Sequence, residues 1–202
     1  MNFASFPLIA AAQQARPTKP ALLLPTCYYA NLTTHPTRME TRESMQQKPT
    51  KVMALYNKVT RLPFGQKIFS IMVSRMAPYF GTVRPLITEL RPNYCQCLIK
   101  KRKAVHNHIQ TVHVIAICNG LEMAMGVMAE ASIPAHLRWI PKGMSVDYTA
   151  KAGSDIRCVA RVTPEQWVEG DMLVPVTAYD NNDVVVVKGH IKLWISAKPA
   201  KN

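Results

Sequence analysis

Apolar residues recur at helical spacing over residues 51–80, where Pro63 and Gly65 interrupt the pattern. The interruption predicts two short amphipathic helices rather than one. Residues 82–90 and 94–103 are rich in β-branched and apolar residues and flank the turn sequence Arg-Pro-Asn, so they are predicted to form a hairpin of two strands.

A long apolar segment occupies residues 111–131 and contains no proline, while Pro134 follows it closely. Because nearly all of its residues are apolar, the segment predicts one helix that is buried on most sides. Turn sequences rich in Gly, Asp and Asn divide the remainder into four predicted strands. These strands comprise residues 139–151, 155–162, 172–179 and 184–195.

Apolar and polar residues alternate strictly within the first of these strands. Met144, Val146, Tyr148 and Ala150 share one face, which is predicted to be buried. Short connections between consecutive strands require antiparallel pairing. The order of two strands, one buried helix and four strands therefore predicts an α+β domain, in which an antiparallel sheet of about six strands wraps around a long central helix. Helices precede this core in the chain.

Residues 1–50 differ from the rest, with six prolines and no acidic residue before Glu40. This composition predicts a disordered extension. Its lack of acids and its arginines also resemble an organelle transit peptide, and a third interpretation places the true start at Met39, Met45 or Met53. The predicted organisation is an extension over residues 1–50 and one folded domain over residues 51–202.

The formal charge of +13 favours anionic partners such as nucleic acid, anionic lipid or coenzyme A. After residue 50 the chain has 20 basic and 10 acidic residues, so the excess belongs to the predicted domain. The five cysteines are odd in number and irregularly spaced, which predicts reduced thiols and a cytoplasmic protein. Even the most apolar window, residues 111–129, contains Glu122 and two glycines, so no membrane span is expected.

Glu122 is the only acidic residue between Glu89 and Glu130, and it lies in the most apolar predicted helix. An ionised carboxylate in such surroundings needs a partner or a chemical role. Glu122 is therefore the first candidate for a general base that activates water or for a nucleophile. The alternative is that it faces solvent or pairs with an arginine of a second subunit.

Glu122 is also the last member of a recognisable spacing: Asn107 is followed by His113 after six residues and by Glu122 after nine more. In type and spacing these residues resemble the phenylacetate-pathway type of acyl-CoA thioesterase. The longer segments 106–125 and 138–144 more closely resemble a functionally uncharacterised hot-dog family of thioesterase-like proteins. The resemblance extends over residues 56–195.

The resemblance implies a hot-dog fold, a homodimer or dimer of dimers, and an acyl-CoA or acyl-carrier thioester as substrate. Asn107 and His113 would orient the substrate, while Glu122 of the other subunit acts on it. Lys151 and Arg138 flank the strand that borders the coenzyme A channel in related thioesterases, so either could contact a phosphate. Coenzyme A would be part of the substrate, and no separate cofactor is expected.

Two positions depart from the thioesterase pattern. Gln110 stands where glycine is usual, and Val114-Ile115 replaces a frequent Gly-Gly pair. Glycines there let a thioester carbonyl approach backbone N–H groups closely. The departures keep open a second hypothesis, a non-catalytic hot-dog module that binds acyl-CoA or an acyl chain.

Two further interpretations are weaker. His106 and His108, with two cysteines upstream, lack the regular spacing of a zinc site, so no metal is predicted. The basic run at residues 100–103 could contact a nucleic acid, but it has no interleaved aromatic residues and stands at the end of a predicted strand. No nucleic-acid partner is therefore expected.

Overall fold

The computed structural model describes residues 49–199, so the predictions for residues 1–48 concern a segment outside the described part. The helices are α2 (Lys51–Val59), α3 (Gly65–Met76), α4 (Phe80–Val83) and α5 (Val114–Ser132). The strands are β1 (Leu86–Arg91), β2 (Tyr94–Ile99), β3 (Leu137–Tyr148), β4 (Ile156–Arg161), β5 (Gly170–Tyr179) and β6 (Val185–Ala197). Single 3₁₀ turns, η1 (Lys103–Val105) and η2 (Pro164–Gln166), lie in two of the connections.

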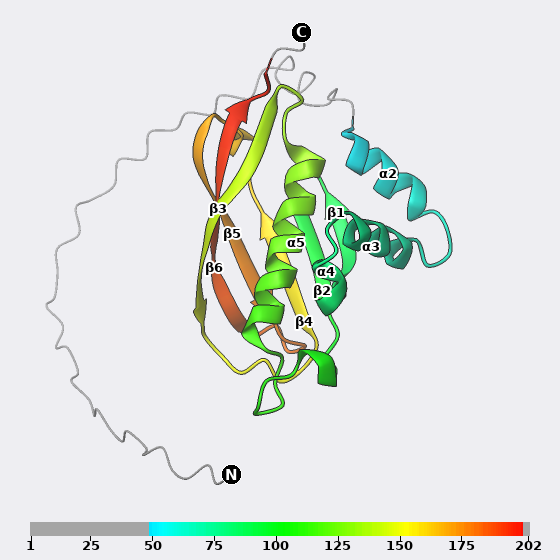
Figure 1. The fold of residues 1–202 in the computed structure, drawn as a ribbon, viewed down its shortest axis with the longest axis vertical. Helices are drawn as coiled ribbons and strands as arrows, with labels where there is room; N and C mark the ends of the chain where they lie inside the picture. The colour runs from blue at the N-terminus through cyan, green and yellow to red at the C-terminus, as the bar shows by residue number, and fades with distance from the viewer. Residues whose placement is uncertain (1–48, 200–202) are drawn as a thin grey trace, which may run out of the picture. The chain divides into compact units, whose positions relative to one another are not determined.

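The strands form a single six-stranded sheet in the order β1-β2-β4-β5-β6-β3, and every neighbouring pair is antiparallel. Figure 1 shows α5 lying along the sheet, which wraps around it. This is the hot-dog arrangement, and the predicted order of two strands, a buried helix and four strands is confirmed. Within the described residues, β1 and β3 form the two edges of the sheet.

Helix α5 is the centre of the core. Its side chains facing the sheet, including Leu121, Met125 and Met128, are fully buried. By length and composition alone the helix is apolar enough to cross a membrane, so the sequence pattern underestimated how apolar this segment is. Most of it is buried within the domain, so in this fold it is the core helix of the sheet.

Several predicted bounds differ from the structure. Strand β2 ends at Ile99, so the basic run at residues 100–103 lies outside it. The first strand begins at Leu86 rather than at residue 82, because Arg84 has a left-handed backbone (φ 60°) that ends α4 just before Pro85. The predicted buried face of β3 is only partly buried. Met144 and Val146 are half-buried against the core, whereas Tyr148 is 63% exposed, because β3 is an edge strand. Ala150 lies past the end of β3 and is likewise exposed.

The two predicted N-terminal helices are present as α2 and α3, and polar contacts fix α3 to β1. The Ser70 hydroxyl accepts a hydrogen bond from the backbone N–H of Ile87 (2.8 Å) and is itself buried. Gln66 donates through Nε2 to the carbonyl of Thr88 (2.7 Å). Both bonds come from one side of α3, so the opposite side of this helix faces away from the sheet.

Candidate functional site

A hollow of about 490 Å³ lies where the N-terminal end of α5 meets β3 and β6. Its lining comes from the loop before α5, the first turn of α5, residues 148–152, and Val186 with Val187 on β6. Three of the predicted site residues, Asn107, His113 and Lys151, line it together. Glu122 and Arg138 are not part of this lining.

Asn107 holds the loop before α5 in shape. Its Nδ2 donates to the hydroxyl of Thr111 (2.7 Å), and its Oδ1 accepts from the backbone N–H groups of Ile109 (3.1 Å) and Thr111 (3.0 Å). These bonds close a turn of the kind that asparagine side chains favour. In the single chain the amide of Asn107 therefore organises the wall of the hollow.

Gln110 explains one departure from the thioesterase pattern. Its backbone lies in the left-handed region (φ 62°), where glycine is favoured because it has no Cβ. The turn at this position therefore keeps the conformation that a glycine would take, although the residue is glutamine. The change costs backbone strain of about 1 kcal/mol rather than a change of loop shape.

His113 caps the N-terminus of α5. Its Nδ1 accepts a hydrogen bond from the backbone N–H of Ile115 (3.1 Å), and its carbonyl accepts from the N–H of Ala116 (2.9 Å). An imidazole that accepts through Nδ1 carries its proton on Nε2 when neutral, so Nε2 can donate to a ligand. The cap role and a substrate role are therefore compatible.

Val114 supplies a further donor at the same end of α5. Its side chain lines the hollow, and the structure gives its backbone N–H no hydrogen-bond partner among residues 49–199. Unpaired N–H groups and the positive end of the helix dipole favour negative charge at this point. The valine side chain does not remove this donor.

Glu122 is exposed in the single chain. It belongs to an exposed stripe of α5, together with Ile115 and the half-buried Cys118. Nine residues separate Glu122 from His113, which corresponds to about 13 Å along the helix and to opposite sides of it. The two side chains of one chain therefore do not act together on a single small group.

Cys118 shares this stripe and lies one turn before Glu122. Burial raises the pKa of its thiol, and the nearby Glu122 carboxylate adds to the rise. A thiol with a raised pKa is mostly protonated at neutral pH and is a weak nucleophile. Cys118 is therefore a poor candidate for covalent chemistry.

Asn119 is a residue that the sequence reasoning did not single out. It is only 4% exposed, yet neither Oδ1 nor Nδ2 of its amide has a hydrogen-bond partner in the described structure. An unpaired buried amide is costly, so each case calls for an explanation. The signal available in the sequence was an asparagine within the most apolar helix, one turn before Glu122.

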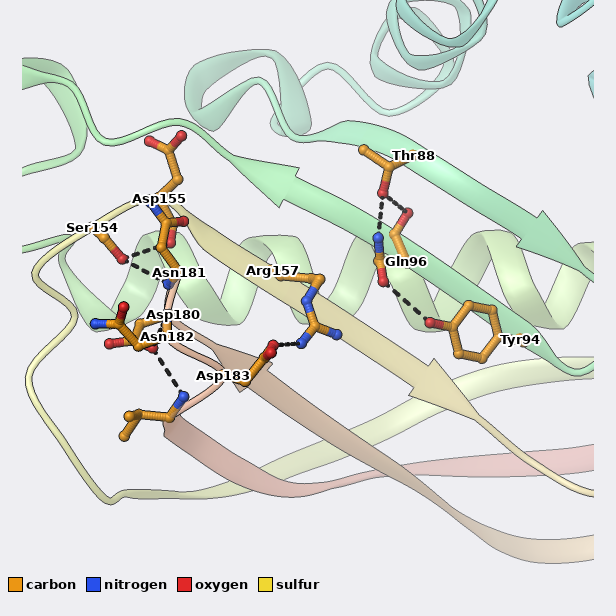
Figure 2. A network of polar contacts seen from close by, with 11 residues as sticks. Thr88, Tyr94, Gln96, Ser154, Asp155, Arg157, Asp180, Asn181, Asn182 and Asp183 are labelled. Carbon is orange, nitrogen blue, oxygen red and sulfur yellow. Dashed lines mark hydrogen bonds and ion pairs between the residues drawn. The ribbon is translucent and has the colours of Figure 1, made fainter.

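Lys151 lies on a loop that is tied down at several points. Asp155 accepts from Lys100 Nζ (2.7 Å) and from the backbone N–H of Lys101 (2.8 Å), and Ala152 accepts from the N–H of Val112 (2.9 Å). Figure 2 shows the neighbouring tie, in which Ser154 accepts from the N–H of Asn181 in the β5–β6 turn (3.0 Å). The backbone that carries Lys151 is thereby fixed beside the hollow.

Arg138 lies at the opposite end of β3 from the hollow, where its Nε donates to Ser196 (3.1 Å). Within one chain it therefore does not meet Lys151. The basic run at residues 100–103 is engaged locally: besides the bond from Lys100, Lys101 donates to the carbonyl of Gly153 (2.9 Å) and Arg102 to that of Val83 (2.9 Å). The basic run therefore has a structural role, because its side chains hold neighbouring loops in place.

Among the described residues, no three His, Cys, Asp or Glu side chains come together as metal ligands. The described cysteines, Cys95, Cys97, Cys118 and Cys158, are all free thiols.

The fold and site can be set beside known proteins. Residues 65–195 match the family described as a domain of unknown function, DUF4442. A crystal structure described only as a genomics target is 41% identical, with a TM-score of 0.66, over 73% of this chain and 99% of that one. The comparison with curated proteins gives no match.

Two more distant structures show the same fold. A thioesterase family protein from Silicibacter pomeroyi is 16% identical, with a TM-score of 0.55, over 67% of this chain and 100% of its own. A thioesterase from Haemophilus influenzae is 6% identical, with a TM-score of 0.56, over 67% of this chain and 93% of its own.

Proposed function

This chain belongs to the DUF4442 family, and we propose that it hydrolyses acyl thioesters, with acyl-CoA as the main substrate class, at a site shared by two subunits. The observation that carries the proposal is the hollow at the N-terminal end of α5, where Asn107, His113 and the free N–H of Val114 meet. The names of the distant structural neighbours as thioesterases support the reaction class.

The proposed chemistry follows from the charge that develops in the reaction. When a hydroxide equivalent adds to the thioester carbon, the carbonyl oxygen becomes an oxyanion, and the Val114 N–H and the helix dipole stabilise it. Glu122 takes the proton from the attacking water, or attacks the carbon itself. In the first route the C–S bond then breaks, the thiolate takes the proton that Glu122 holds, and the acyl group leaves as a carboxylic acid. In the second route the C–S bond breaks to leave an acyl–Glu122 anhydride, and a water molecule then hydrolyses this anhydride, which releases the carboxylic acid and restores Glu122.

The separation within one chain requires Glu122 to come from a second subunit, because it lies about 13 Å along α5 from His113. We propose that the unpaired edge of β3 joins two copies. It is 12 residues long and exposed, and such edges pair readily with another strand. This homodimer would cover the exposed stripe of α5, and a dimer of dimers is compatible with it.

Antiparallel pairing of two β3 strands about their middle has a testable consequence for substrate binding. It sets the partner subunit's Arg138 opposite the end of β3 that leads to Lys151. The two cations would then flank one hollow, although they lie far apart in a single chain. We propose that both contact the phosphates of coenzyme A: Arg138 through two hydrogen bonds from its guanidinium, and Lys151 through the single charge of its ammonium group.

Asn119 completes the proposed site. Its buried, unpaired amide lies one turn before Glu122, so a substrate or water that reaches this turn can satisfy it. We propose that it orients the attacking water or the substrate carbonyl. No cofactor is needed for this chemistry, and a cytoplasmic location remains a prediction.

The competing function is a binding module without turnover. Val114 favours it, since its side chain lines the hollow at a position where thioesterases often have glycine. Ile115, the second replaced glycine, is 54% exposed and is not part of the lining, so it does not obstruct the hollow. Of the two replaced glycines, only the one at Val114 therefore affects access to the hollow.

The test is thiol release from short, medium, long and aromatic acyl-CoAs, measured on wild type and on Glu122→Gln, with acyl-CoA binding followed in parallel. Glu130→Gln is the matched control, because Glu130 is also exposed on α5 and can still accept from Trp139 as glutamine (2.9 Å in the wild type). Hydrolysis that only Glu122→Gln abolishes supports the proposal. Binding without release by the wild type establishes the module instead.

A further inference from the structure

The outer face of α3 carries exposed apolar side chains that neither the core nor the proposed site uses. Phe64, just before the helix, is 82% exposed, and Ile68 and Ile71 are 40% and 43% exposed. Counted at 100° per residue, Lys67, Ile68, Ile71 and Arg75 fall within a sector of about 100° on the helix. Phe64 has a left-handed backbone (φ 59°) and lies near Lys67 at the start of the helix. Together these residues form one stripe, called here the α3 stripe.

The orientation of the α3 stripe is fixed by the opposite side of the helix. Phe69 is buried and stacks edge-on against Tyr56 of α2, with ring centroids 5.1 Å apart, while Ser70 is hydrogen-bonded to β1. Gly65 at the start of α3 packs closely against the end of α2, since a Cβ there would lie 2.2 Å from the carbonyl oxygen of Val59. The helix therefore cannot roll to bury its apolar stripe.

The chain segment that carries the α3 stripe has charged residues of a single sign. Between residues 51 and 88 the chain has no Asp or Glu. All of its basic residues there are exposed and, within the described part, none makes a salt bridge: Lys51, Lys58, Arg61, Lys67, Arg75 and Arg84. A hollow of about 440 Å³ at the start of α3 is lined by Lys67 and Gln66 beside Leu62 and Phe64.

We infer that the α3 stripe docks the protein on the surface of an anionic phospholipid bilayer. Phe64, Ile68 and Ile71 would enter the boundary between headgroups and acyl chains, while Lys67 and Arg75 contact lipid phosphates beside them. Helices that lie in the membrane interface combine these two features, an exposed apolar stripe and flanking cations.

The combination distinguishes a bilayer from other occupants. A nucleic acid would use the cations and leave the aliphatic side chains in water. A second copy of this chain would bring the same unpaired cations together, which is unfavourable. The stripe also lies away from the proposed dimer edge, because α3 is anchored to β1 at one edge of the sheet and β3 is the other edge (Figure 1).

The experiment is co-flotation of the full chain with vesicles of phosphatidylcholine alone, or with about one third phosphatidylserine. We expect binding to the anionic vesicles that weakens as salt rises. Each basic residue at a membrane surface contributes roughly fivefold to partitioning, so the double variant Lys67→Glu/Arg75→Glu should bind at least about 25-fold more weakly. Phe64→Asn/Ile71→Gln, which keeps the charge, should also lose binding.

The matched control is Arg161→Glu/Lys188→Glu, which makes the same change in net charge at exposed positions on β4 and β6. It should bind within about threefold of the wild type, and thermal unfolding should show that every variant is folded. The inference fails if the wild type does not float with anionic vesicles, or if the α3-stripe variants float like the wild type. The inference also fails if the chain does not float with vesicles but instead self-associates or binds duplex nucleic acid, and the α3-stripe variants lose that activity.

Discussion

Gly189 on β6 is the position where the smallest substitution should have a large effect on the wall of the site. It pairs with Val146 on β3 and with Val176 on β5, so it has a neighbouring strand on each side. A Cβ added at Gly189 would lie 2.0 Å from the carbonyl oxygen of Ser145 and 2.7 Å from the Cα of Val146. Gly189→Ala therefore requires β3 to move outward by about 1 Å or more.

The cost can be worked out from the ladder that this movement disturbs. Displacing β3 near Ser145 weakens two to four backbone hydrogen bonds to β6, each worth about 1 kcal/mol net, so a loss of about 2–4 kcal/mol is expected. For a domain of this size that corresponds to a fall in Tm of roughly 5–15 °C. Since β3 also leads to Tyr148 at the hollow, thioester hydrolysis should fall as well.

Thermal unfolding followed by circular dichroism measures the effect, with Gly81→Ala in α4 as the control. A Cβ at Gly81 meets no atom within 4 Å, and alanine is the better helix former, so its Tm should be unchanged or slightly higher. A Gly189→Ala variant that unfolds within about 2 °C of the wild type would refute the described register of β3 on β6.

Three further predictions concern single side chains. The hydrogen bond from Lys100 lowers the pKa of Asp155, so the stability that this pair contributes is present above the unfolded-state pKa and is lost as the pH falls through the lowered folded-state pKa. Asp155→Asn should therefore reduce the free energy of unfolding by about 0.5–1 kcal/mol near pH 7 and leave it unchanged in strong acid. The Tm of the variant and of the wild type, compared at both pH values, measures this difference. Cys118→Ser should keep thioester hydrolysis, and a complete loss would contradict its assignment as an inert thiol. Lys151→Ala and Arg138→Ala should each raise the KM for acyl-CoA several-fold and change kcat little. If the wild type has the same KM for acyl-CoA and for a truncated thioester that lacks the phosphates, the two residues do not contact phosphate.

The sequence predicted elements well where one physical constraint dominated. The segment around Glu122 has no proline and few polar residues, which left one long buried helix as the reasonable outcome. Prediction from the sequence failed where a single backbone angle or a position at the edge of the sheet determined the structure. Arg84 gives no sign in the sequence of its left-handed backbone, and the alternating pattern at Tyr148 does not reveal that β3 lies at an edge.

For the site, the sequence supplied residue types and spacing, because helical period and turn chemistry are local. It could place Asn107 and His113 at the start of the central helix, and Glu122 two and a half turns later. Only the tertiary structure decided which of them share a hollow, since that depends on β3 and β6, which come much later in the chain. The same long-range packing left the amide of Asn119 unpaired and turned the apolar stripe of Phe64, Ile68 and Ile71 outward, because burial is a property of the assembled core and not of the residue.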